Sequence, residues 1–268
     1  MSVPLRRPAL LGELAGGIRR SSITHQDGTM DDSTHVTWFQ GISLYVDCRF
    51  PAERPSFGDV SCLADLARVE PAKSHWLARQ VGFAGDCEQQ DGHTTWHRII
   101  DLQPPAVLPD VGKLYWEQDV LIERGELVDH VERWHPERVQ AASVPSVFGA
   151  VLHDASSQRS AILVRVDDRF AFARGRTTAL PVGSTLLQLL TAETSHDRRA
   201  DLLDCEIALG VIDAGCWKIG LSTLPYREGT DLAVRIAGNC VTTADLTRDG
   251  ATTLTSWQVL RQEGVFGS

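Results

Sequence analysis

Short segments of alternating side-chain character, separated by turn-forming residues, recur along most of this chain. A spacing of about 8–12 residues between such segments is typical of meandering antiparallel sheets. Regular alternation of strands with helices, the sign of a parallel sheet, is missing. We therefore predict a mainly β protein with two tandem antiparallel β-barrels. The predicted strands are residues 41–51, 82–90, 94–101, 113–125, 126–136, 146–155, 160–166, 169–176, 231–242 and 255–265, with 205–225 as a hairpin turning at Asp213–Gly215.

The domain boundaries follow from composition and from the helical segments between the strands. A chain of 268 residues is long enough for two modest domains. Helical spacing of apolar residues predicts short helices, the last of them capped by Ser184. The predicted helices are 59–70, 71–82 and 183–203; the predicted domains are a flexible N-terminal arm over 1–33, a first barrel over 34–138 and a second over 144–268, joined by a polar linker within 135–146.

Composition excludes several classes of partner. The net charge of -9 argues against nucleic acid, since phosphate binding needs a basic surface. No apolar run approaches the roughly 18 residues of a membrane-spanning helix. The six cysteines are scattered without a C-x-x-C pair, which favours a reducing cytoplasm over a disulfide framework. We expect a small organic molecule as the partner, no nucleic acid and no membrane, and leave a homodimer open.

A set of polar and aromatic residues carries a family resemblance. Trp38, Gln40, Ser43, Tyr45, Asp47 and Arg49 form the pattern W-x-Q-x-x-S-x-Y-x-D-x-R, followed by GFAG, WHRIIDLQPP and VERWHP. The chain thereby resembles bacterial and fungal proteins built from two lipocalin-like β-barrels in tandem, most strongly over 38–136. CEIALG and GCWKIGLSTLPYREG extend the resemblance into the second half. The resemblance implies a cup-shaped site for a small organic molecule and no agreed catalytic residues.

The strand 41–51 has two possible orientations. Alternate side chains of a strand point to opposite faces. One face carries Ser43, Tyr45, Asp47 and Arg49, and the other is apolar. The alternation by itself favours an apolar face in the core and a polar face in water. In a small barrel, however, the polar face lines the interior, where a ligand site needs a few placed polar groups among aromatic ones.

The segment 94–105 has no cleanly apolar face. His97 and Asp101 alternate with Ile99, while Arg98 lies between Trp96 and Ile100. One face must therefore bury a polar group, at a cost of about 1–3 kcal/mol if that group has no partner. Pairing of His97 or Arg98 with a neighbouring carboxylate as a structural link is as good an explanation as a role in a site.

The segment 126–136 places His130, Glu132 and Trp134 on one face. A carboxylate that orients an imidazole, with an indole beside it, suits proton transfer near neutral pH. An exposed edge strand also explains the segment, and taken alone it is the simpler explanation.

Several strands of the first domain thus combine an acid with a base, and we predict that these groups share one cavity. His97 and His130 are the predicted catalytic proton carriers, and Asp101 and Glu132 orient them. The predicted ligand-binding residues are Tyr45, Asp47, Arg49, Trp96, Gln103, Glu117, Glu123 and Trp134. We predict no metal site, because no H-x-H or H-E-x-x-H spacing occurs.

The predicted function is acid–base chemistry on an enclosed small organic molecule without a cofactor, as in an isomerase, lyase or cyclase of natural-product biosynthesis. Patterns of serine hydrolases, NTPases and dinucleotide-binding enzymes are absent. Three alternatives are open: a non-catalytic carrier or sensor, a haem-binding barrel, and a structural protein whose second barrel is a docking surface.

Overall fold

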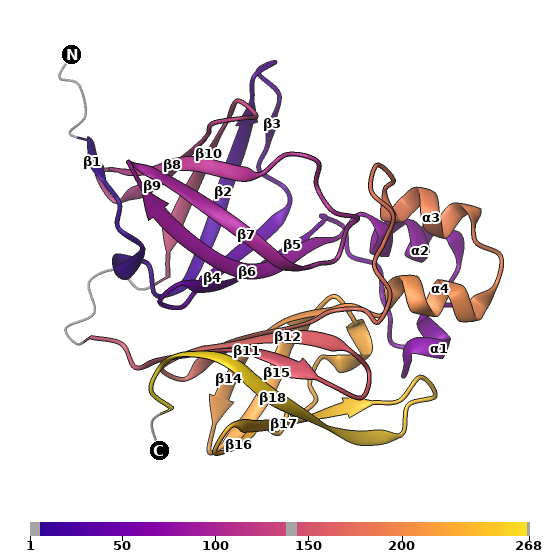
Figure 1. Ribbon diagram of the computed structural model, residues 1–268. Helices are drawn as coiled ribbons and strands as arrows, with labels where there is room; N and C mark the ends of the chain where they lie inside the picture. Colours follow the sequence, from indigo (N-terminus) through magenta and orange to yellow (C-terminus); the bar gives the residue numbers. More distant parts are fainter. Residues whose placement is uncertain (1–5, 138–143, 267–268) are drawn as a thin grey trace.

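A computed structural model describes residues 6–137 and 144–266 of the chain. The centre of the predicted linker, 138–143, lies outside the described residues. Two antiparallel sheets and four short helices form the described structure, so the prediction of a mainly β fold is confirmed (Figure 1). Along the described chain no helix is long and apolar enough to cross a membrane.

The first sheet closes into an eight-stranded barrel, called barrel one below. Each strand is hydrogen-bonded to two neighbours in the order β8-β7-β6-β5-β4-β2-β10-β9, and β9 pairs again with β8. Two short strands, β1 (Arg6–Pro8) and β3 (Met30–Asp31), add to β8 and β2. The barrel strands are β2 (Gly16–His25), β4 (His35–Gln40), β5 (Leu44–Phe50), β6 (Val81–Gln90), β7 (His93–Asp101), β8 (Asp110–Glu117), β9 (Val120–Gly125) and β10 (His130–Pro136).

The second sheet, called sheet two, is curled but not closed by strand pairing between its edges. Its order is β15-β14-β13-β12-β11-β18-β17-β16. Leu232 bridges the gap: its N–H donates to the Trp217 carbonyl at 2.9 Å, and its carbonyl accepts from the N–H of Ala244 at 2.7 Å. The strands are β11 (Val147–Asp154), β12 (Arg159–Val166), β13 (Arg169–Arg174), β14 (Glu206–Asp213), β15 (Cys216–Ser222), β16 (Arg235–Ala237), β17 (Cys240–Leu246) and β18 (Thr252–Gly264). The hairpin predicted to turn at Asp213–Gly215 is confirmed by β14 and β15.

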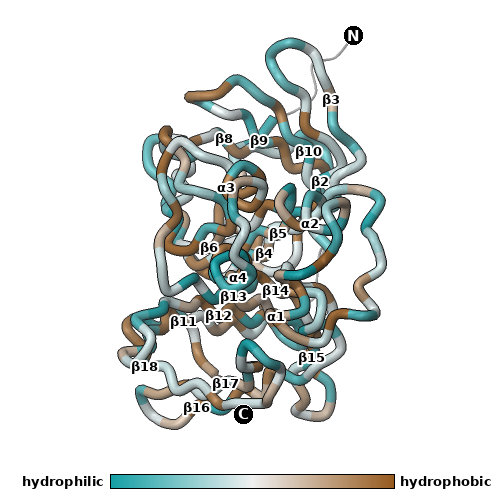
Figure 2. Tube along the Cα trace, turned by 90° about the vertical axis from the view of Figure 1, so that its right-hand side faces the viewer, coloured by the Kyte–Doolittle hydropathy of each residue, from teal (hydrophilic) through white to brown (hydrophobic). Residues whose placement is uncertain are grey.

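Four helices lie beside the junction of the two sheets, as Figure 2 shows from the helical side. The predicted single helix over 183–203 is wrong, because the chain forms two helices there. Thr185, not Ser184, caps the first through a capping box, and Ser195 caps the second. Glu193 between them has extended backbone, so local side-chain capping interrupts the apolar periodicity. The helices are α1 (Leu63–Leu66), α2 (Pro71–Ala78), α3 (Leu186–Ala192) and α4 (His196–Leu203), with 3-10 turns η1 (Leu11–Glu13) and η2 (Pro225–Arg227).

Two further sequence predictions differ from the structure. Residues 16–25, expected in a flexible arm over 1–33, form β2 and pair with both β4 and β10. Ile18 is buried in the barrel, which the basic character of this segment concealed. Residues 113–125, predicted as one strand, are β8 and β9 joined by a tight turn in which Gln118 has a φ of 56°.

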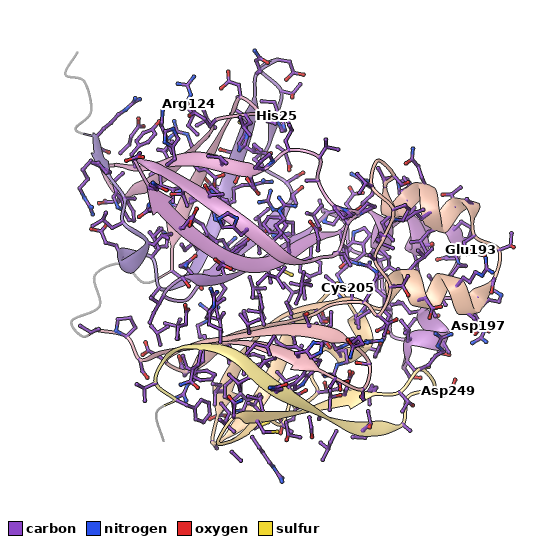
Figure 3. The ribbon with its side chains drawn as sticks, viewed as in Figure 1. His25, Arg124, Glu193, Asp197, Cys205 and Asp249 are labelled. Carbon is purple, nitrogen blue, oxygen red and sulfur yellow. The ribbon has the colours of Figure 1, made fainter. Side chains whose placement is uncertain are left out.

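Three apolar cores stabilise the molecule. One lies inside barrel one, and a second lies inside sheet two. The third lies between the sheets and the helices, where Leu44 and Val46 of β5 pack with Val164 of β12 and Leu186 of α3. Figure 3 places Cys205 at this junction, and its thiol is 3.9 Å from the carbonyl of Asp101 in barrel one. Burial of both sides of β5 follows from this shared core.

Candidate functional site

The polar face of β5 points into barrel one. Its apolar face, including Leu44 and Val46, is covered by sheet two and the helices. Tyr45 and Asp47 are therefore 0% and 3% exposed, and with Arg49 they line an interior cavity. The conventional orientation, with this face in water, is wrong. A strand covered on its outer side by a second sheet has no wet face left.

The mixed faces of β7 result from a β-bulge. Gly85 pairs with Arg98 and Ala84 with Ile100, so Ile99 has no partner in the register. The extra residue reverses the alternation. Arg98 consequently lines the cavity, whereas Ile100 packs in the core between the sheets. The bulge thus directs Arg98 and Ile100 to opposite sides of the strand and leaves Ile99 exposed.

Strands β9 and β10 supply the other acidic groups of the site. Glu123 of β9 is opposite Glu132 of β10 in the strand register, and both carboxylates are buried. Trp134 and His130 of β10 line the same cavity. The register pairs His130 with His25, which Figure 3 shows with Arg124 at one end of barrel one. Exposed Val128 at that end marks the cavity mouth.

The cavity has a volume of about 260 Å³. The indole of Trp38 contacts two others within it. Its ring centroid lies 5.8 Å from those of Trp96 and Trp134, edge to face in both pairs. The part of the barrel beyond them is filled by apolar side chains. The lining residues are Ile23, Trp38, Tyr45, Asp47, Arg49, Phe83, Trp96, Arg98, Asp110, Glu123, Val128, His130, Glu132 and Trp134.

Two ion-pair networks neutralise much of the buried charge. In the first, Arg49 contacts Asp47 at 2.7 Å and Glu132 at 3.5 Å, while Arg20 contacts Glu132 at 2.9 Å and Asp31 at 3.1 Å. A buried charge without such a partner costs several kcal/mol. The strands β2, β5 and β10 are therefore linked through one carboxylate, that of Glu132.

The second network is centred on Arg98. Its guanidinium donates to Asp101 at 3.0 Å and to Asp110 at 2.7 Å. The same group lies 3.6 Å above the ring of Phe83, a cation–π contact. Arg98 is thus held in place by β8, by its own strand and by an aromatic face.

Glu123 and His130 form an acid–base pair at the mouth. The Glu123 Oε1 atom lies 3.7 Å from His130 Nε2, and His130 Nδ1 is 2.8 Å from the carbonyl of Val128. Burial, with repulsion by Glu132, raises the pKa of Glu123 to about 7. The neighbouring Glu123 carboxylate raises the pKa of His130. The pair therefore holds a proton near neutral pH.

On the cavity-lining residues, Arg98 Nε lacks a hydrogen-bond partner within the described structure, and so do three polar atoms of buried side chains: the Tyr45 hydroxyl, Trp134 Nε1 and Glu132 Oε2. Their side chains are 0%, 1% and 2% exposed. Buried polar groups are nearly always hydrogen-bonded, and an unpaired one costs about 1–3 kcal/mol. The residues that carry them come from two strands, β5 and β10, and all three line the one cavity.

The predicted residues Tyr45, Asp47, Arg49, Trp96, Glu123, His130, Glu132 and Trp134 all line this cavity. The structure places four others elsewhere. His97 points outward and contacts Glu88 at 3.2 Å, and Glu117 is bound by Arg6 at 2.7 Å. Asp101 is bound to Arg98, and Gln103 donates to the carbonyls of Ala78 and Gln80.

The sequence analysis missed Arg20, Trp38, Phe83 and Asp110 as cavity or supporting residues. It offered Arg98 as the partner of a neighbouring carboxylate, which the contacts with Asp101 and Asp110 confirm, but not as a cavity residue. Trp38 and Arg98 were in the segments analysed, but the face of Arg98 depends on the bulge. Arg20 has a usable signal, because it lies two residues after Ile18 in β2 and therefore on the same face of the strand. The sequence paired His130 with Glu132. In the structure, Glu132 contacts arginines, and the carboxylate beside His130 is that of Glu123.

Comparison with known proteins identifies the architecture and no activity. No protein family matches this sequence. No curated protein matches it either. Among solved structures, an uncharacterized protein of Saccharomyces cerevisiae, YLR301w, is similar with a TM-score of 0.51 and 12% sequence identity, covering 94% of this chain and 100% of the yeast chain. That similarity supports the fold, which is compatible with binding a small molecule. Among the described residues no group of three or more His, Cys, Asp or Glu side chains is arranged to hold a metal ion.

Proposed function

We propose that barrel one binds a small organic molecule in its 260 Å³ cavity. The observation that carries this proposal is the convergence of three buried, unpartnered polar atoms, on Tyr45, Glu132 and Trp134, around one volume. Concave sites with aromatic walls and a few placed polar groups are the usual form of ligand sites. The resemblance of the sequence to tandem lipocalin-like barrels supports the same conclusion.

We further propose that the bound molecule undergoes cofactor-independent proton transfer. Glu123 and His130 support this step, because a base whose pKa lies near the working pH both accepts and returns a proton efficiently. Isomerisation, elimination or cyclisation is the corresponding type of reaction. His97 has no part in this proposal, since it lies outside the cavity and contacts Glu88.

We propose no haem as the ligand of this cavity. Its volume of about 260 Å³ suits a small molecule better than a group of haem size. His130 is the histidine among the lining residues, and its two ring nitrogens already face Val128 and Glu123. The proposal therefore involves no haem.

A non-catalytic carrier or sensor is the second candidate. The paired state of Arg20, Arg49 and Arg98 favours it, because these groups are held by neighbouring carboxylates before any ligand enters. Native mass spectrometry of freshly purified protein separates the candidates. A carrier retains one ligand per chain and releases it unchanged, whereas an enzyme converts it.

Tyr45→Phe and Trp134→Phe test the binding proposal in a fragment screen by saturation-transfer NMR. Each removes one unpartnered polar atom while keeping an aromatic ring. Because a neutral hydrogen bond contributes about 0.5–1.5 kcal/mol, we expect fragment affinity to fall about fivefold in each variant. Tyr115→Phe is the matched control, since Tyr115 is absent from the cavity lining and stacks under Arg6. Unchanged binding of every fragment in both cavity variants would contradict the assigned site.

A further inference from the structure

The charges around the cavity of barrel one are unequal. Six carboxylates and three guanidiniums line or support it. Each guanidinium is held by two carboxylates. The pairs are Arg20 with Asp31 and Glu132, Arg49 with Asp47 and Glu132, and Arg98 with Asp101 and Asp110. Arg98 Nε and Arg20 Nε have no hydrogen-bond partner among the described residues, but the carboxylates outnumber the guanidiniums, so a cation meets surplus negative charge.

One buried carboxylate oxygen is left without a donor. Glu132 Oε1 accepts a hydrogen bond from Arg20 and lies 3.5 Å from Arg49 Nη1. Glu132 Oε2 has no partner among the described residues. Such an oxygen only accepts hydrogen bonds, so the ligand must supply an N–H or O–H. Trp134 Nε1 only donates, so the same ligand must also carry an acceptor.

We propose that the ligand is a small organic cation, a protonated amine that also carries a hydrogen-bond acceptor. This inference rests on the proposed binding function of barrel one. The ammonium group contacts Glu123 and Glu132, and the acceptor of the ligand accepts hydrogen bonds from Trp134 Nε1 and the Tyr45 hydroxyl. The aromatic walls suit an organic cation, because ammonium groups are attracted to the faces of tryptophan and tyrosine.

Proton binding at the mouth competes with this cation. Glu123 faces His130 and Glu132 of β10, Asp110 of β8 and Arg49 of β5. With a pKa of about 7, its carboxyl is mostly protonated at pH 6 and mostly ionised at pH 8. The amine stays protonated throughout this range. Its affinity is therefore expected to rise about tenfold from pH 6 to pH 8.

Three probes of nearly equal size test the inference: tyramine, its neutral analogue tyrosol and its anionic analogue 4-hydroxyphenylacetate. Their dissociation constants are measured by NMR titration of the full chain at pH 6 and pH 8. We expect tyramine at pH 8 to bind at least about tenfold more tightly than tyrosol, since hydrogen bonds to charged groups are stronger than neutral ones. 4-Hydroxyphenylacetate is expected to bind most weakly.

Two variants accompany the probes. Glu123→Gln removes the carboxylate that titrates in this range, so it should abolish the pH dependence and reduce the preference for tyramine over tyrosol to the part that Glu132 supplies. Glu126→Gln makes the same change on an exposed residue outside the cavity and should preserve both. The comparison of the three probes on the unaltered protein stands even if Glu123→Gln fails to fold.

The outcomes separate this inference from the function beneath it. In one outcome, tyrosol or 4-hydroxyphenylacetate binds as tightly as tyramine, and Trp134→Phe weakens that binding. That result overturns the inference of a cationic ligand and leaves the proposed binding site intact. Binding of none of the three probes, together with an empty fragment screen, overturns the proposed function itself.

Discussion

Glu123 and His130 are the residues whose protonation is most closely tied to the fold. Both have a raised pKa in the folded protein, Glu123 because it is buried beside Glu132 and His130 because it meets the Glu123 carboxylate. A raised pKa means that the folded state holds its proton to higher pH than the unfolded chain does. The stability that this proton contributes is complete below the unfolded pKa and is lost as pH rises through the folded value.

Glu123→Gln should therefore flatten the pH dependence of stability. The unaltered protein loses free energy of unfolding from this pair as the pH rises from about 5 to about 8, whereas the neutral amide does not titrate. We expect the variant to gain about 1–3 kcal/mol relative to the unaltered protein over this range. Urea unfolding at both pH values measures the difference, with Glu126→Gln as the surface control. Parallel pH profiles for Glu123→Gln and the unaltered protein would show that Glu123 is ionised at neutral pH.

Strand β7 depends on a single bulge that period-2 alternation cannot reveal. The sequence correctly indicated that segment 94–105 buries polar groups, and it correctly placed the strand. It could not show that Arg98 and Ile100 face opposite sides, because the extra residue Ile99 is specified by its partner strand. Gly85 on β6 allows the close approach, since a Cβ there would overlap the carbonyl oxygen of His97.

Gly85→Ala should consequently destabilise barrel one. The overlap involves backbone on both strands, so relief requires a shift of the bulge rather than a side-chain rotation. We expect a loss of about 1–3 kcal/mol in unfolding free energy and weaker ligand binding, because Arg98 moves with the bulge. Gly12→Ala is the control, since a Cβ there meets no atom within 4 Å. An equal effect of the two substitutions in urea unfolding would contradict a steric role for Gly85.

At the scale of the whole molecule, the site depends on contact between the two sheets. Glu263 of β18 accepts the N–H groups of Ile42, Ser43 and Leu44 at 2.7, 2.8 and 3.1 Å, where the chain turns into β5. Sheet two also covers the apolar side of β5. Its contribution is thus to bury the outside of the strand whose inside carries Tyr45 and Asp47.

The sequence predicted the fold class and most of the strands, because alternation and turns are local signals. It could not predict the shared core. Alternation identifies an apolar face of β5 without saying what covers it, so the sequence left both orientations of the polar face open. It also did not assign β2, whose arginines resemble those of a solvated arm until the contact of Arg20 with Glu132 is known. Long-range pairing decides both points.

The shared cavity of barrel one is tested most directly by the indole N–H resonances of the tryptophans during a tyramine titration. Trp134 Nε1 has no protein partner in the described structure, whereas Trp38 Nε1 donates to Gln40 at 2.8 Å and Trp257 Nε1 to Thr243 at 2.9 Å. We expect the assigned Trp134 resonance to move most as the ligand saturates the protein, with Trp257 unchanged. Saturable binding that leaves the Trp134 indole resonance unshifted would contradict a ligand site inside barrel one.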